Sequence, residues 1–231
     1  MDTSSLKIQR GMARQLQVWR EITSGSDHRL GWKVGFNLTA DQQRLHLNSA
    51  MVGFLSDKHR LASGEHYPAS PGAVLLAEPE IAVQIGCTIH EGATTAEANA
   101  SIIAYTAALE LVDTTRSVND DMEEILAGNL FHERVLLAEP HLPAKEYAHE
   151  ELMLSLRVNG SEVRTLEPER VPGDFSTVIL DVANMLAAHG EQLRQGDWII
   201  TGAAARPTPI QAGDEIVLDM GQLGKVNLGI R

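Results

Sequence analysis

Apolar residues recur at three- and four-residue spacing near the start of the chain, and this spacing predicts an amphipathic helix over residues 5–23. Its apolar positions are Leu6, Ile8, Met12, Leu16, Trp19 and Ile22. The polar sequence SGSD at 24–27 ends it. A second helix is expected from Thr94, where TTAE is a capping-box sequence ahead of an alanine-rich run. A third is expected between Asp174 and Gly190, where Ile179, Val182, Ala183 and Leu186 share one face.

Short apolar runs separated by turn residues predict strands over most of the remaining chain. They are LGWKVGF (30–36), MVGFL (51–55), AVLLAEPEIAVQIG (73–86), ALELVD (108–113), ELMLSLRVNG (151–160), DWIITG (197–202), QAGDEIVLDM (211–220) and GKVNLGIR (224–231). Asn159-Gly160 is a hairpin turn signal. A few helices around many short strands favour one α+β domain with a rolled sheet over a doubly wound fold. We expect a single domain over residues 1–231, with residues 1–27 as a helical segment packed on it.

The composition of the chain limits the kinds of molecule that it is expected to bind. A formal net charge of -12 disfavours nucleic acid and anionic membranes as general partners, and an anionic ligand would need local positive charge. The single cysteine, Cys87, lies in an apolar stretch, which predicts a small buried side chain rather than a nucleophile. The N-terminal residues lack a secretory pattern, and no apolar run has the length of a membrane span. We therefore expect a soluble, cytoplasmic protein.

Three glutamates interrupt apolar strands. Alternation along EPEIAV puts Glu78 and Glu80 on one face, about 7 Å apart along the backbone, and Glu110 is a third lone carboxylate in ALELVD. Like charges in an apolar sheet are costly unless something neutralises them. Oxygen donors without cysteine or an obligatory histidine suit Mg²⁺ or Mn²⁺. The alternative to a metal site is that these glutamates lie on a solvated strand face or pair with arginines.

Two other polar side chains are candidates for the chemistry. Lys33 stands between Trp32 and Val34, so it either reaches out to the surface or is paired within a site, where it would supply positive charge to an anionic substrate. His132 and Glu133 could form an acid–base pair, although adjacent strand residues point to opposite sides. A surface or packing histidine is the alternative for His132.

The segments LGWKVGF, EPEIAV, ALELVD and VANMLAAHGEQLRQGDWIITG occur in the order and near the spacing of the fumarylacetoacetate hydrolase superfamily. From about Ile8 to the C-terminus the chain resembles its 2-oxopent-4-enoate hydratase and 4-oxalocrotonate decarboxylase branch. The resemblance implies a mixed β-sandwich roll with peripheral helices. It also implies Glu78, Glu80 and Glu110 as ligands of Mg²⁺ or Mn²⁺ and Lys33 as a catalytic, substrate-binding lysine. Substrate binding by Asn129, Thr201 and Gly202 is implied as well.

The resemblance further implies a metal-dependent lyase, a hydratase or decarboxylase of aromatic meta-cleavage catabolism. Its substrate would be a small 2-oxo or 2-hydroxy-dienoic acid, with the cation stabilising an enolate, in a homo-oligomer formed with or without a related subunit. The alternatives are an acylpyruvate hydrolase, an oxaloacetate decarboxylase, or a non-catalytic 2-oxo-acid-binding subunit that retains the fold. Two positions depart from the branch pattern: Met51 stands where an aspartate is usual, and Gly128-Asn129 replaces Asp-Asn. The proton-transfer half of the site is therefore expected to be altered, which predicts a poor hydratase.

Overall fold

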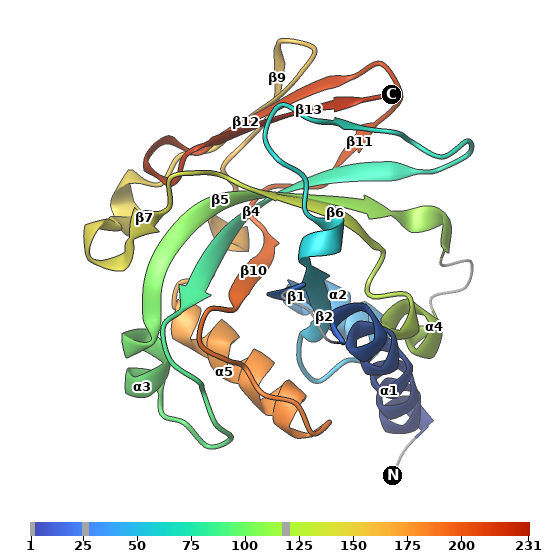
Figure 1. Cartoon of the computed structure of the whole chain (residues 1–231), viewed down its shortest axis with the longest axis vertical. Coiled ribbons are helices and arrows are strands. Elements are labelled where there is room, and N and C mark those ends of the chain that lie inside the picture. The colour runs from blue at the N-terminus through green and yellow to red at the C-terminus, as the bar shows by residue number, and fades with distance from the viewer. Residues whose placement is uncertain (1–2, 25–27, 117–120) are drawn as a thin grey trace.

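The computed structural model describes residues 3–24, 28–116 and 121–231, which form two mixed sheets with helices packed outside them (Figure 1). The larger, 8-stranded sheet has the order β2-β1-β10-β4-β5-β6, with β11 paired to β4 and β7 paired to β5. Its strands are β1 (Arg29–Gly35), β2 (Met51–Ser56), β4 (Leu75–Ile85), β5 (Ile102–Asp113), β6 (His132–Leu137), β7 (Leu142–Pro143), β10 (Trp198–Ala203) and β11 (Thr208–Ile210). The expected α+β class and rolled mixed sheet are confirmed.

The smaller, 5-stranded sheet has the order β3-β13-β12-β8-β9. It contains β3 (His66–Tyr67), β8 (Ser155–Val158), β9 (Ser161–Thr165), β12 (Glu215–Asp219) and β13 (Lys225–Ile230). The α-helices of the described residues are α1 (Thr3–Thr23), α2 (Thr39–Leu45), α3 (Thr95–Ala100), α4 (Met122–Ala127) and α5 (Phe175–Ala187). None of these helices is both long and apolar enough to cross a bilayer.

Local sequence signals explain the ends of the expected helices. The Thr94 hydroxyl accepts from the backbone N–H of Glu97, whose carboxylate accepts the N–H of Thr94 in return, so the capping box forms as predicted. Asp174 caps α5 by accepting from the backbone N–H of Ser176. The sequence did not indicate α2 and α4, because helices of 7 and 6 residues are too short to show periodicity.

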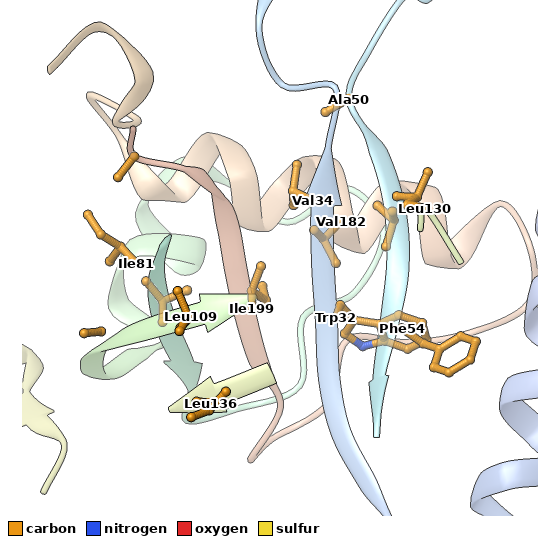
Figure 2. Close-up of a cluster of buried hydrophobic side chains, with 14 of the residues drawn as sticks. Trp32, Val34, Ala50, Phe54, Ile81, Leu109, Leu130, Leu136, Val182 and Ile199 are labelled. Atoms are coloured by element: carbon orange, nitrogen blue, oxygen red, sulfur yellow. The ribbon is translucent and has the colours of Figure 1, made fainter. Parts of the chain in front are cut away.

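The core lies between the larger sheet and its covering elements. Figure 2 shows Ile81, Leu109 and Leu136 gathered on one side, and Trp32 beside Phe54 on the neighbouring strands β1 and β2. The apolar face of α5 packs against β1, β2 and β10, as its spacing predicted.

A polar clamp attaches α1 to this sheet. The ring of Trp19 lies 5.1 Å from that of Trp32, and the Arg29 guanidinium stacks over both rings. Asp197 accepts hydrogen bonds from Arg29 (2.5 and 2.6 Å) and from the Trp32 indole N–H (3.0 Å). The clamp fixes the start of β1, the strand that carries Lys33.

Two local expectations were wrong. Cys87 is exposed, because β4 ends at Ile85 and the chain bends before the cysteine. The strand expected over 151–160 begins only at Ser155, since His149–Glu151 forms a 3₁₀ turn. Neither difference changes the positions of the three glutamates, which lie within β4 and β5.

Candidate metal centre

The three predicted glutamates converge on one point of the larger sheet. Glu78 on β4 lies directly opposite Glu110 on β5, and Glu80 follows two residues later on the same strand face. Each contributes an oxygen, and these oxygens lie within 4.8 Å of one another. A cation 2.0–2.6 Å from each ligand requires oxygens no more than about 5 Å apart. The spacing therefore fits one shared ion.

The burial and hydrogen bonding of these glutamates also fit a bound cation. Glu80 and Glu110 are 1% and 0% exposed, yet Glu80 Oε1 and Glu110 Oε2 have no hydrogen-bond partner among the described residues. A buried, unsatisfied carboxylate oxygen is costly. A donor set made only of oxygens suits a hard divalent cation such as Mg²⁺ or Mn²⁺.

The pKa shifts of the three glutamates also favour a bound cation. Burial, followed by the charge of Glu110, raises the pKa of Glu78 to about 7. Burial and the two neighbouring carboxylates raise the pKa of Glu80 well above its ordinary value. Burial would raise the pKa of Glu110 too, but the Lys33 ammonium and the hydrogen bond to His132 outweigh it and hold that pKa low. Neighbouring groups thus outweigh burial only at Glu110, so a bound cation would be needed to keep Glu78 and Glu80 ionised.

Lys33 on β1 reaches inward to this centre. Its side chain is 3% exposed, and its ammonium donates to Glu110 Oε1 and to the backbone oxygen of Leu130, the latter at 3.1 Å. The alternative of a lysine reaching the surface is therefore excluded. The ion pair with Glu110 gives the lysine a structural role besides the substrate-binding role that the resemblance implies.

The ring of His132 also contacts Glu110, a link that the sequence pattern did not predict. Its Nδ1 lies 2.7 Å from Glu110 Oε1, and burial lowers the pKa of the ring. A β-bulge explains the contact: the register shifts between Leu111 and Val112, so that His132 lies opposite Val112 and on the face of Glu110. Without the bulge, Glu133 would take that place. The bulge, which periodicity does not reveal, decides which residue of the His132-Glu133 pair meets the site.

Thr201 and Gly202 on β10 support the glutamates from the next strand. The Gly202 N–H donates to Glu80 Oε2 at 2.7 Å, and the Thr201 hydroxyl donates to the Ile81 carbonyl at 3.0 Å. Gly202 has φ +100, and a Cβ there would lie 2.3 Å from the Asn37 amide nitrogen, so only glycine fits. Their contact with substrate stays a prediction.

Asn129 begins a strained turn between α4 and β6. Asn129, Leu130 and Phe131 all have left-handed backbones, with φ of 57, 52 and 65. The Asn129 amide pairs with both backbone groups of Phe54, at 2.7 and 2.9 Å. The turn also directs the Leu130 carbonyl to Lys33. Asn129 thus holds the turn in place, and substrate contact by its side chain stays a prediction.

A cavity of about 410 Å³ opens beside the centre, and its wall includes Lys33, Asn37, Glu78, Leu130, Arg170 and Ala203. Met51 does not line it: this side chain is 1% exposed and packs in the hydrophobic core. An acid–base group at position 51 would thus be buried among apolar side chains, and the methionine there serves packing.

A curled mixed sheet presents three converging glutamates, two of them fully buried, and a buried lysine beside a small cavity, an arrangement suited to a carboxylate-held cation. The chain belongs to the fumarylacetoacetate hydrolase C-terminal family, whose model matches residues 34–231. Curated relatives include 4-oxalocrotonate decarboxylases from Pseudomonas sp. (21% identical; 93% of this chain, 83% of the relative) and Pseudomonas putida (22%; 92% and 81%). These matches confirm the family and branch expected from the sequence.

Solved structures agree on the fold. The 4-oxalocrotonate decarboxylase of Pseudomonas putida G7, complexed with magnesium and adipate, matches with a TM-score of 0.85 at 24% identity, covering 95% of this chain and 85% of that chain. The fumarylpyruvate hydrolase of Pseudomonas aeruginosa, in complex with Mn²⁺ and pyruvate, matches with a TM-score of 0.67 at 18% identity, covering 90% and 93%. Both relatives are enzymes whose structures hold a divalent cation and a small acid.

Proposed function

We propose that this protein is a divalent-metal-dependent lyase that removes CO₂ from a small 2-oxo acid, with Glu78, Glu80 and Glu110 as the ligands of Mg²⁺ or Mn²⁺. The observation that carries the proposal is the convergence of three carboxylates, two of them with unpartnered buried oxygens, beside a cavity that Lys33 also lines. The relatives named above support it, since the curated ones are decarboxylases.

The chemistry divides between the bound cation and the chain. When bound, the cation supplies a Lewis acid for the 2-oxygen, where negative charge develops as CO₂ departs. Lys33 adds a fixed positive charge at the cavity wall and binds the anionic substrate. Gly202 holds Glu80 in place through its N–H, while Lys33 and His132 hold one oxygen of Glu110. The other oxygen, Oε2, stays available as a ligand atom.

Decarboxylation is favoured over hydration because the curated relatives are decarboxylases. Adding water to a dienoate requires a placed general acid–base group, which typically contributes about 10²- to 10⁴-fold in rate. Position 51, where the branch usually has an aspartate, supplies no such group here, because Met51 cannot transfer protons and lies in the core away from the cavity. Loss of CO₂ depends chiefly on an electron sink at the 2-oxygen, which the metal centre can provide.

The test is a product analysis with wild type and Glu80→Gln. Each protein is incubated with a panel of 2-oxo acids, including unsaturated diacids and 2-hydroxydienoates, in Mg²⁺ or in EDTA. We expect CO₂ release by wild type in Mg²⁺, loss of release in EDTA, and a decrease of at least about 10²-fold in Glu80→Gln. Products of water addition or C–C hydrolysis would instead indicate a hydratase or an acylpyruvate hydrolase. Metal-dependent binding without turnover would indicate a non-catalytic subunit.

A further inference from the structure

The two oxygens of the Glu110 carboxylate have different surroundings. Oε1 accepts a hydrogen bond from the Lys33 ammonium and lies 2.7 Å from His132 Nδ1. Oε2 is buried and has no hydrogen-bond partner among the described residues. An ionised carboxylate offers about four lone-pair sites, two on each oxygen. The two contacts therefore occupy both sites of Oε1, and only Oε2 is left to bind a cation.

The ring of His132 is placed to donate this second hydrogen bond. Its side chain is 0% exposed and packs against the ring of His59, with the ring centroids 5.8 Å apart. An ionised carboxylate only accepts hydrogen bonds, so the 2.7 Å contact is attractive only when His132 Nδ1 carries the hydrogen. The β-bulge between β5 and β6 puts the ring on the face of Glu110. His132 thus takes the lone-pair site of Oε1 that Lys33 leaves open.

Glu80 is restricted in a similar way. Its Oε2 accepts the Gly202 N–H at 2.7 Å, and its Oε1 has no hydrogen-bond partner among the described residues. Two of the three glutamates therefore favour coordination through a single oxygen. Mg²⁺ requires near-ideal octahedral geometry at about 2.0–2.1 Å and usually keeps several waters. Ca²⁺ takes about six to eight oxygens and accepts both oxygens of one carboxylate. Carboxylates that each present one oxygen suit the smaller ion.

We propose that His132 is a positioning residue of the metal centre, which keeps Glu110 to one-oxygen coordination and makes the site discriminate against Ca²⁺. The inference rests on the proposed function only in taking the three glutamates as the ligands. Without the His132 donor, one lone-pair site of Oε1 becomes available, and the Glu110 carboxylate can turn to present both oxygens. Ca²⁺ gains a ligand atom from this change, whereas Mg²⁺ and Mn²⁺ lose a ligand held in a fixed orientation.

Two substitutions of His132 separate the hydrogen bond from the volume of the ring. The amide nitrogen of asparagine is as many bonds from Cβ as the Nδ1 of histidine, so His132→Asn keeps a donor to Glu110. His132→Leu puts a methyl group at the same number of bonds and removes the donor. Calorimetric titration of the chelator-treated proteins with MgCl₂, MnCl₂ and CaCl₂ gives the Kd of each ion.

The expected result is a change in the order of the three affinities. Wild type should bind Mg²⁺ and Mn²⁺ more tightly than Ca²⁺. His132→Leu should weaken Mg²⁺ and Mn²⁺ by about 10- to 100-fold, the usual effect of removing a group that orients a metal ligand. Its Kd for Ca²⁺ should change by less than about threefold, because the second oxygen compensates. His132→Asn should keep the wild-type order, with a Kd for Mg²⁺ within about threefold of the wild-type value.

His141→Leu is the matched control. His141 is also a partly buried ring, but it packs edge-on against Trp198, with the ring centroids 4.6 Å apart, and does not line the cavity. Its substitution should leave all three Kd values unchanged. If His132→Leu does not fold, His132→Gln replaces it. The glutamine amide takes the place of Nε2, which has no hydrogen-bond partner among the described residues, so this variant should shift the selectivity in the same direction as leucine.

The outcomes separate this inference from the proposed function. Equal weakening of the three ions in His132→Leu, or no change in any of them, would overturn the positioning role and leave the ligand assignment intact. The same loss in His132→Asn as in His132→Leu would also overturn it, because it would show that the ring's packing and not its donor matters. A wild type that binds Ca²⁺ as tightly as Mg²⁺ would overturn it as well. Failure of the wild type to bind any of the three ions would instead refute the proposed function.

Discussion

Replacing Lys33 with methionine tests how much the Lys33–Glu110 ion pair stabilises the protein when no divalent cation is bound. The Lys33 ammonium is the buried positive charge paired with Glu110, and both side chains are almost fully enclosed, at 3% and 0% exposure. Methionine keeps the length of the apolar stem and removes the charge. Glu110 then keeps only its contact with His132.

The expected decrease in the free energy of unfolding of Lys33→Met depends on whether a divalent cation is bound. Removing one partner of a buried ion pair costs about 3–5 kcal/mol, because the other charge is left unpaired. In EDTA we expect the lower end, about 3 kcal/mol, since His132 still donates to Glu110. A divalent cation at 100 times its Kd stabilises the folded wild type by about 2.7 kcal/mol. Without the repelling ammonium the cation should bind about tenfold tighter, so about 1.4 kcal/mol of the loss is recovered.

Urea denaturation followed by tryptophan fluorescence measures both quantities, in EDTA and in saturating MnCl₂. Lys58→Met is the control, because Lys58 is exposed and its substitution should change the free energy of unfolding by less than about 0.5 kcal/mol. The same penalty for Lys33→Met in EDTA and in MnCl₂ would refute the electrostatic link between Lys33 and the bound cation. No penalty in EDTA would refute the stabilising role of the ion pair.

Three further predictions concern the same centre. Glu80→Gln should abolish a single Mn²⁺ site in calorimetric titration and stabilise the cation-free protein, because it removes a buried, repelled carboxylate; unchanged Mn²⁺ affinity would contradict the ligand assignment. Folding raises the pKa of Glu78 from 4.5 to about 7, so the folded state binds more protons between these values. The free energy of unfolding in EDTA should therefore fall by up to about 3 kcal/mol from about pH 5 to about pH 8, and a rise in urea titrations would contradict this. Met51→Asp should destabilise the protein by about 3 kcal/mol or more, because it places a carboxyl group in the apolar core; a stable variant with hydratase activity would show that position 51 reaches the substrate.

Much of the fold was predictable because its signals are local. Capping residues and apolar spacing identify α3 and α5, and alternating or continuous apolar runs identify the strands. The pairing of the strands is not local: β1 pairs with β10 in parallel across more than half the chain, and no short pattern encodes that register. Cys87 shows that the end of a strand is hard to predict, because apolar residues continue in the sequence beyond Ile85, where the strand ends.

The candidate site also has a part that the sequence predicts and a part that depends on the tertiary structure. The three glutamates stand out in the sequence because each interrupts an apolar strand, and the structure brings their oxygens together. The contacts of Lys33 and His132 with Glu110 depend on how the sheet curls and where β6 bulges, which are tertiary features. Arg170 lies in a polar connection whose composition resembles that of any surface loop, so only the cavity reveals its position.

The turn of three left-handed residues after α4 restricts how this protein can change in evolution. Each such residue costs roughly 1–2 kcal/mol relative to a right-handed one, so three in succession do not accumulate without a compensating advantage. Connections ordinarily accept insertions and deletions most readily. Here one added or lost residue would separate the Asn129 amide from Phe54 and the Leu130 carbonyl from Lys33 in a single step. In descendants of this chain the length of segment 128–132 should therefore vary less than its side chains, and glycine should be the easiest replacement for Leu130 and Phe131.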